Sequence, residues 1–394
     1  MFILILWLLP GAALKAQNID STKVKTQIDS TLSLSAMYGS KPVDLVDYVA
    51  KFLKVKAPEE KRSNRKVRFS LFPTQSGASG KTIVTTFNAT FLLGDISNTN
   101  ISTLYFIPYI SFSNQYGFQL QPNIWLSKNS WNFTGEYFIL NFPQNTWGLG
   151  GDSQEENELL VESNHLRVYQ NALIKIVPNL AVGLGYALDR HYAIETGESQ
   201  TITVVDSSKA TTSSGIAFPV IFDNRRNSIN PQQGIYAKLA VNLYLPGLGS
   251  DDKWQYLFCD VRKYFNLSDR KTSILAFRSY YWTILSGNAP YLDMPAVRWE
   301  PALGSASRGI RQGRYRSNAI LYGEAEYRFG ITANDFLGGV VFTNVTAPSR
   351  YDTQQFVYLH PAVGAGIRLK FNKYSRTNVT LDYGASKEFQ SVYL

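Results

Sequence analysis

The residues that most often carry chemistry in proteins are few and scattered in this chain. Its three histidines, His165, His191 and His360, stand far apart, with no HExxH or comparable metal-ligand spacing. Asp189, Arg190 and His191 are consecutive, and we interpret them as a polar cluster at the edge of a loop. The sequence has no GxSxG nucleophile elbow and no Walker loop. We therefore expect no catalytic residue, no metal site and no cofactor.

Carboxylates are plentiful, but their neighbours explain them without catalysis. Glu324 and Glu326 share one face of an expected strand with Arg316 and Arg328, which favours a structural charge network. We therefore expect a protein that is not an enzyme. The alternative left open is a Ser/His or Asp/His pair assembled across strands.

The composition excludes several classes of protein. Of 394 residues, 14% are aromatic and 18% are charged, whereas soluble domains have about 25% charged residues. The single cysteine, Cys259, allows neither an intramolecular disulfide nor a cysteine-based zinc site. The net charge is +9, but Lys and Arg alternate with apolar residues along strands, so we expect no basic groove and no nucleic-acid binding.

The first sixteen residues, MFILILWLLPGAALKA, have the pattern of a secretory signal peptide. An apolar run from Phe2 to Leu9 meets a Pro-Gly break, and small residues lead to Ala16, so we expect cleavage before Gln17. No later apolar run reaches 18 residues, which excludes a bundle of transmembrane helices. The chain is therefore expected to be exported.

Residues 17–66 differ from the rest of the chain and are expected to form a periplasmic segment. They are rich in Ser, Thr, Asp and Lys, and one stretch, PVDLVDYVAKFLKV, places apolar side chains on one face of a short helix: Leu45, Val46, Val49, Phe52 and Leu53. A basic linker follows as far as Lys66. We interpret this linker as a solvated tether, with contact to anionic lipid or to the mouth of a barrel as the alternatives.

From Val67 onward the sequence alternates with a period of two, which predicts strands with one apolar and one polar face. In GIYAKLAVNLYL, for example, Leu239 falls on the apolar face and Lys238 on the polar face. We expect sixteen strands, near residues 67–72, 82–93, 102–114, 118–127, 132–140, 160–177, 180–195, 210–223, 234–245, 254–266, 272–286, 316–329, 336–345, 360–371, 376–384 and 388–394.

The connections between these strands alternate in length. Those after even-numbered strands are mostly tight, such as Pro178-Asn179, and those after odd-numbered strands include every long one, such as 287–315. Short turns on one side and long loops on the other are typical of bacterial outer-membrane barrels, whose strands need ~9–11 residues to cross the hydrocarbon. We predict an all-β fold, a closed 16-stranded antiparallel transmembrane β-barrel at residues 67–394, in the outer membrane of a Gram-negative bacterium with its N-terminus in the periplasm.

Several motifs occur in an order that resembles the BamA/TamA superfamily of outer-membrane assembly and translocation barrels, and within it the surface-antigen type of Bacteroidetes-like bacteria. FDNRRNSINPQQG is similar to the family's turn into the second half of the barrel, with the motif residues Asp223, Arg225, Pro231 and Gly234. GSASRGIRQGRYR is similar to the tip of the family's sixth loop and places Arg308 and Gly309 on its motif. GEAEYRF, GAGIRLKF, VTLDYG and TWGLGGDSQEE resemble further family segments.

The resemblance implies that the sixth outward loop folds back into the barrel and that Arg308 bonds to the polar wall. The expected wall residues are Glu324, Glu326, Arg328, Asn344, Arg368 and Asp382, and the strand alternation independently places most of these on the polar face. Asn344 stands where the family usually has a carboxylate, so we expect it to accept a hydrogen bond from Arg308 without an ion pair. Ile310 replaces the family's aromatic residue.

Family members that fold or secrete proteins carry periplasmic POTRA domains, and residues 17–66 are too few for one. We therefore expect a barrel that is accessory to protein or lipid assembly or translocation, and that opens laterally between its first and last strands. Its expected partners are outer-membrane lipid and periplasmic or outer-membrane proteins. The alternatives are a passive pore that favours anions, with Lys238, Arg368 and Lys370 in its lumen, and a structural surface protein.

Overall fold

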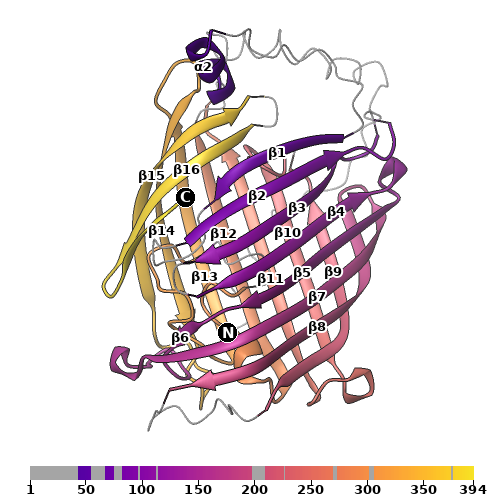
Figure 1. Ribbon diagram of the computed structural model, residues 1–394, viewed down its shortest axis with the longest axis vertical. Coiled ribbons are helices and arrows are strands. Elements are labelled where there is room, and N and C mark those ends of the chain that lie inside the picture. The colour runs from indigo at the N-terminus through magenta and orange to yellow at the C-terminus, as the bar shows by residue number, and fades with distance from the viewer. Residues whose placement is uncertain are drawn as a thin grey trace, which may run out of the picture.

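Antiparallel strands form one long sheet that curls into a barrel-like wall (Figure 1). The computed structural model describes residues 43–54, 67–74, 82–95, 98–111, 114–197, 209–225, 227–268, 273–300, 306–373 and 376–394. The expected signal peptide, 1–16, and most of the segment 17–66 lie outside the described residues. No helix among the described residues is long and apolar enough to cross a membrane.

The strands are β1 (Val67–Thr74), β2 (Thr82–Phe91), β3 (Ser102–Ser111), β4 (Tyr116–Trp125), β5 (Trp131–Asn141), β6 (Gln144–Thr146), β7 (Leu159–Val177), β8 (Leu180–Thr196), β9 (Thr211–Asp223), β10 (Gly234–Tyr244), β11 (Trp254–Asn266), β12 (Ile274–Gly287), β13 (Ala319–Gly330), β14 (Leu337–Pro348), β15 (His360–Asn372), β16 (Thr377–Ser386) and β17 (Gln390–Tyr393). Sixteen of them correspond to the predicted strands, and the short β6 was not predicted. The helix α2 spans Leu45–Phe52, and short 3-10 turns include η5 (Pro246–Leu248) and η6 (Tyr291–Asp293).

Apart from the short β6, which pairs beside β5 on β7, each strand pairs with the next one along the chain, so the wall is an up-and-down meander. Most of the short connections lie at one end of the wall, which we call the turn rim; they include 178–179, 224–233, 267–273, 331–336 and 373–376. The long connections lie at the other end, the loop rim: 142–158, 197–210, 288–318 and 349–359. This arrangement follows the predicted alternation of connection lengths.

The sheet does not close, which corrects the prediction of a closed barrel. Among the described residues, β1 pairs only with β2, and β17 pairs only with β16. The physical reason lies in β17, whose four residues pair with only the Asp382–Ala385 part of β16. The wall therefore has two free margins, β1 and the hairpin of β16 and β17 (Figure 1).

The two faces of the wall differ as the alternation predicts. Apolar side chains on the outer face stay exposed, including Leu239, Phe277, Val341, Ile367 and Leu381. Neighbours in the same strands are buried on the inner face, including Asn242, Tyr244, Phe342 and Asp382. An exposed apolar outer surface is what a membrane-embedded strand presents to lipid.

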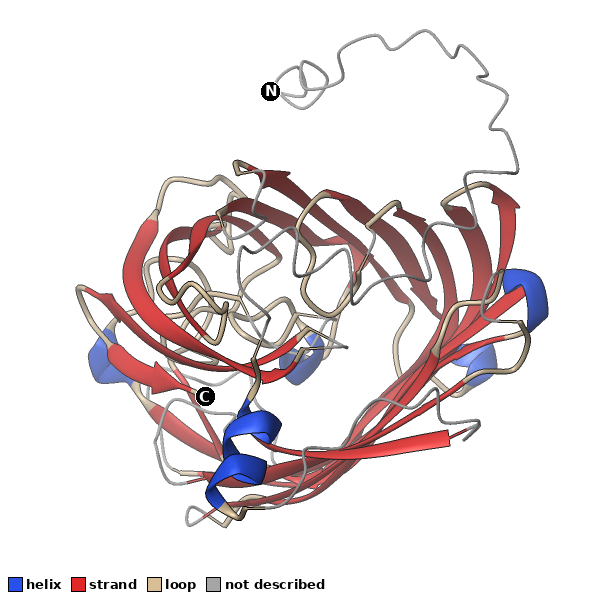
Figure 2. Ribbon diagram, turned by 90° about the horizontal axis from the view of Figure 1, so that it is seen from above, coloured by secondary structure: helices blue, strands red, loops and turns tan. Residues whose placement is uncertain are grey.

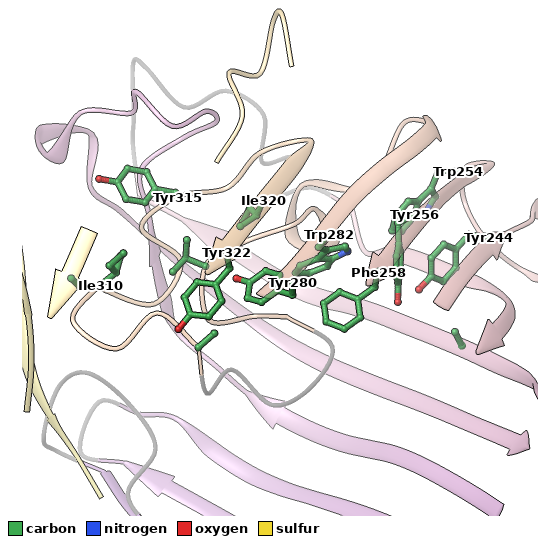
Figure 3. Close-up of a cluster of buried hydrophobic side chains, with 14 residues drawn as sticks. Tyr244, Trp254, Tyr256, Phe258, Tyr280, Trp282, Ile310, Tyr315, Ile320 and Tyr322 are labelled. Atoms are coloured by element: carbon green, nitrogen blue, oxygen red, sulfur yellow. The ribbon is translucent and has the colours of Figure 1, made fainter. Parts of the chain in front are cut away.

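Aromatic side chains fill part of the interior. Strands β10 to β13 contribute Tyr244, Trp254, Tyr256, Phe258, Tyr280, Trp282, Ile320 and Tyr322 (Figure 3). The connection 288–318 contributes Val297, Ala306, Ile310 and Tyr315 to the same cluster. This connection therefore packs inside the wall, and loops are seen within the ring of strands in Figure 2. We call its described parts, residues 288–300 and 306–318, the inward loop.

Candidate functional site

Backbone hydrogen bonds give the inward loop a hairpin-like shape of its own. The Val297 amide donates to the carbonyl of Tyr315 and the Gly313 amide to that of Val297, each at 3.0 Å. The Arg316 guanidinium is buried and donates to three backbone carbonyls of the same loop, those of Tyr291, Leu292 and Met294. The loop therefore reaches the wall with a defined shape.

Arg308, near the tip of the inward loop, lies in a pocket of carboxylates on the inner wall. Its guanidinium donates to Glu324 at 3.0 Å, to Glu326 at 2.6 Å, and to Asp382. Its central carbon lies 3.7 Å from the centre of the Phe342 ring. Because a guanidinium presents five donors in a fixed plane, it can satisfy acceptors from β13 and β16 at the same time.

Two more arginines complete this pocket. Arg328 bonds to Glu326, and Arg368 lies 3.3 Å from Glu326 and 3.9 Å from Asp382. The Glu326 and Asp382 side chains are only 5% and 7% exposed, so their charges need these partners. We call the group formed by Arg308, Arg328, Arg368, Glu324, Glu326 and Asp382 the arginine pocket.

Asn344 lies beside the arginine pocket, but it acts differently from the expectation. Its side-chain amide donates to the backbone carbonyl of Arg308 at 2.9 Å, and its Oδ1 has no partner. The expected bond from the Arg308 guanidinium to Asn344 is therefore wrong. The amide holds the loop backbone, because the guanidinium is already occupied by Glu324, Glu326 and Asp382.

Gly309 allows the loop tip to approach the last strands closely. Its φ of +94° is in the left-handed region, and a Cβ there would lie 2.9 Å from the Ala362 Cβ and 2.9 Å from the Ala385 nitrogen. Its amide donates to the hydroxyl of Tyr393 in β17 at 2.9 Å. A side chain at this position would push the loop away from β15 and β16.

The inward loop also holds the turn between β16 and β17. Glu388 in this turn accepts hydrogen bonds from Arg314 at 3.1 Å and from the Tyr315 hydroxyl at 3.0 Å. The Arg314 guanidinium also donates two hydrogen bonds to Ser153, each at 3.0 Å, and Ser153 lies in another connection of the loop rim. The terminal hairpin is thus attached to the loop at Tyr393 and at Glu388.

The residues of the turn motif lie at the turn rim. Asp223 and Arg225 form a two-point ion pair at 2.8 Å and 2.7 Å, and Gly234 has a φ of +112°. Pro231 is buried in the same turn.

This turn reaches the arginine pocket through Asn230. The Asn230 amide donates to the Arg376 carbonyl at 3.2 Å, and its oxygen accepts from Arg328 at 3.4 Å. Two motifs predicted separately are therefore connected inside the wall.

A second polar group on the inner wall was not predicted. His165 bonds to Asp189 at 2.8 Å and stacks on His191 with ring centres 3.9 Å apart. His191 bonds to Asp293 of the inward loop at 2.9 Å, and Ser213 donates to the same carboxylate at 2.5 Å. We call these five residues the histidine cluster.

The histidine cluster corrects the interpretation of Asp189, Arg190 and His191 as a loop-edge group. Asp189 and His191 lie within β8 and are each 2% exposed. The antiparallel register of β7 and β8 sets His165 directly opposite His191. The available signal was the strand alternation, which puts residues 189 and 191 on one face.

The hydroxyl of Ser213 donates to the carboxylate of Asp293 and not to a histidine. No group of three or more metal-ligating side chains occurs within the part of the chain that the structure describes. An Asp/His pair assembled across strands was the alternative left open in the sequence analysis, and the cluster contains such a pair. Here the cluster attaches the base of the inward loop to β8 and β9.

Comparison with known proteins supports the fold. No protein-family model and no curated protein matches the chain. BamA from Haemophilus ducreyi, in a structure lacking POTRA domains 1–3, is similar with a TM-score of 0.57 and 11% identity, over 86% of this chain and 73% of that one.

Two CdiB structures are similar as well. CdiB from Escherichia coli has a TM-score of 0.58 and 8% identity, over 86% of this chain and 63% of that one. CdiB from Acinetobacter baumannii has a TM-score of 0.52 and 10% identity, over 83% and 65%. The chain thus spans less than two thirds of the CdiB chains. It has the fold of the BamA and CdiB type of outer-membrane barrel, an antiparallel wall around an inward loop.

Proposed function

We propose that this chain is an integral outer-membrane barrel of the BamA/TamA superfamily, of the surface-antigen type, accessory to protein or lipid assembly or translocation. The observation that carries the proposal is the position of the inward loop, which connects the arginine pocket to a hairpin at an open margin of the sheet. The segment 17–66 is then periplasmic, and residues 67–394 form the barrel.

The contacts between the inward loop and the terminal hairpin suggest how the open margin of the sheet would take part in this function. An edge strand offers unpaired backbone donors and acceptors to another strand or to lipid headgroups. The inward loop holds that edge at Tyr393, at Glu388 and, in β16, at Asp382. A shift of the loop would release the hairpin without any covalent step, so the proposed protein is not an enzyme.

The passive pore is the weaker alternative. Lys238 lies on the inner face near the Phe258 ring, as a cation of an anion pathway would. However, the inward loop and the aromatic cluster occupy the interior beside it. The proposal therefore places function at the margin and not in the lumen.

The test compares the outer membranes of cells with and without the protein. We expect depletion to change the amount of specific outer-membrane proteins or lipids, and the wild-type gene to restore it. Unchanged membrane composition together with ion conductance in planar bilayers would favour the pore instead.

A further inference from the structure

The helix α2 has an apolar face that the barrel leaves uncovered. Phe52, Leu53 and Val49 are 86%, 60% and 47% exposed, whereas Asp44 and Ala50 on the other side are buried. Three large apolar side chains next to one another on a short helix are costly to leave in water. This face is therefore expected to have an occupant.

The exposed face does not result from a loosely placed helix, because α2 is attached to two connections of the turn rim. At its start, the Val43 amide donates to Asn334 at 3.2 Å, and Asp44 accepts from the Lys373 amide at 2.9 Å. The Lys373 ammonium bonds to Asp47 at 2.7 Å.

Two further contacts fix the rotation of α2 about its own axis. The Tyr48 ring lies 4.4 Å from the Phe336 ring, centre to centre. Asp44 and Asp47 form a reciprocal capping box at the first turn. These contacts hold one side of α2 against the barrel and turn Val49, Phe52 and Leu53 away from it.

The charges of α2 indicate which surface its free face would meet. The acidic groups, Asp44 and Asp47, are used by the cap and by Lys373, so they contribute little negative charge to the outside. Lys51, on the opposite face of the helix, and Lys54, just after its end, are exposed. A short helix with one apolar face and lysines on its polar side and at its end has the pattern of a helix that lies in a membrane interface rich in anionic lipid.

The position of α2 in the fold also favours a membrane interface as the surface that its free face meets. The helix lies at the turn rim next to β15 (Figures 1 and 2), where the lipid-facing side of the wall ends. That side carries the exposed residues Val363, Ile367 and Leu381 of β15 and β16. The apolar face of α2 therefore lies at the end of an exposed apolar surface of the wall.

We propose that α2 is an interfacial anchor, with Val49, Phe52 and Leu53 among the acyl chains of the leaflet at the turn rim and with Lys51 and Lys54 at anionic phosphates. A free helix of eight residues is too short to be stable in water. The bonds between Lys373 and α2 keep the helix folded before it meets lipid. We therefore expect the contact of α2 with lipid to weaken when these bonds are removed.

The experiment measures the depth of a spin label on α2 in the full-length protein. In a Cys259→Ser background, Phe52→Cys is labelled and the protein is reconstituted in phosphatidylcholine vesicles with and without phosphatidylglycerol. We expect the label to be about fivefold less accessible to a water-soluble nickel complex than a label at Thr353→Cys, an exposed position in a loop-rim connection. Phosphatidylglycerol should increase this protection, and Lys51→Ala/Lys54→Ala should remove that increase.

Two further measurements make the outcome decisive. Lys373→Ala should raise the accessibility at position 52, because it removes the Asp47 ion pair. Val49→Cys gives an independent label if the first variant migrates abnormally on a heat-modifiability gel. Equal nickel accessibility at positions 52 and 353 in both kinds of vesicle would overturn the proposal. Protection found only in native outer membranes, and not in vesicles, would also overturn it, because the occupant would then be a protein.

Discussion

The arginine pocket and the histidine cluster hold the same loop by different means. The pocket surrounds one loop residue, Arg308, with carboxylates from β13 and β16. In the cluster the roles are reversed, since the loop supplies a carboxylate, Asp293, and the wall supplies His191 and Ser213. A buried ion pair leaves several uncompensated charges when one member is lost, whereas a hydrogen-bonded carboxylate leaves neutral groups. The tip of the loop is therefore more sensitive to substitution than its base.

The largest effect is expected from Arg308→Ala. The change removes the arginine that Glu324, Glu326 and Asp382 share and leaves Arg328 and Arg368 as the cations of the pocket, at an expected cost of about 3–5 kcal/mol of barrel stability. The temperature at which the compact form disappears on a gel measures it. Arg350→Ala in the connection 349–359 is the control, because its ion pair with Asp352 is solvent-exposed, so its transition should stay close to that of the unchanged protein. Equal transitions for the two variants would contradict the difference between pocket and surface.

The second prediction tests the assignment of side chains to the inner and outer faces of the wall. Both the arginine pocket and the histidine cluster depend on this assignment. Leu239 is exposed on the outer face, where arginine near the middle of a bilayer costs roughly 2–4 kcal/mol. Lys238 points inward over Phe258, so Lys238→Leu should leave folding yields into lipid vesicles nearly unchanged. If Leu239→Arg and Lys238→Leu lower the yield equally, the assignment of faces is wrong.

The third prediction concerns the base of the loop. Asp293→Asn keeps the shape of the side chain but weakens its bonds to His191 and Ser213, at about 1.5–3 kcal/mol. The gel transition should fall by less than for Arg308→Ala. The exposed residue Asp352, changed to Asn, serves as the control. A loss as large as that of Arg308→Ala would show that the two regions are equally sensitive.

The fourth prediction extends the comparison to an ion pair outside the membrane. Burial raises the pKa of Asp47, but its bonds to Lys373 and Asp44 and the charge of Lys373 outweigh this and hold the pKa below its ordinary value. The pair therefore stabilises docked α2 above pH ~4 and loses this effect as the pH falls further. Hydrogen exchange of residues 45–52 at pH 7 and pH 3 measures it. Asp47→Asn should remove the pH dependence.

The smallest effect is expected from removing residues 17–58. The helix attaches to the turn rim through a few side chains of its first turns, so a heat-modifiable barrel should still form. The assay is the gel shift of outer-membrane fractions. Loss of the barrel would mean that the segment belongs to the fold and that the boundary near residue 66 is wrong.

The sequence predicted the strands and the arginine pocket better than it predicted closure or the histidine cluster. Strand alternation is local, so Leu239 and Lys238 could be assigned to faces without the structure. Arg308 was identified from a motif within one segment. The pairing of His165 with His191 depends on the register of two long strands, and the open margin depends on how far β17 extends along β16. Both are long-range properties that no short pattern contains.

The composition of the arginine pocket has a consequence for the order in which the barrel is assembled. Arg308 and Asp382 are 74 residues apart in sequence, and β16 is among the last strands of the chain. Contacts between distant residues form late, because long stretches of chain must be closed first. Arg308 therefore gains its full set of carboxylates only after β13 and β16 are both in place. A buried Arg308 side chain would thus indicate that both strands have already joined the wall.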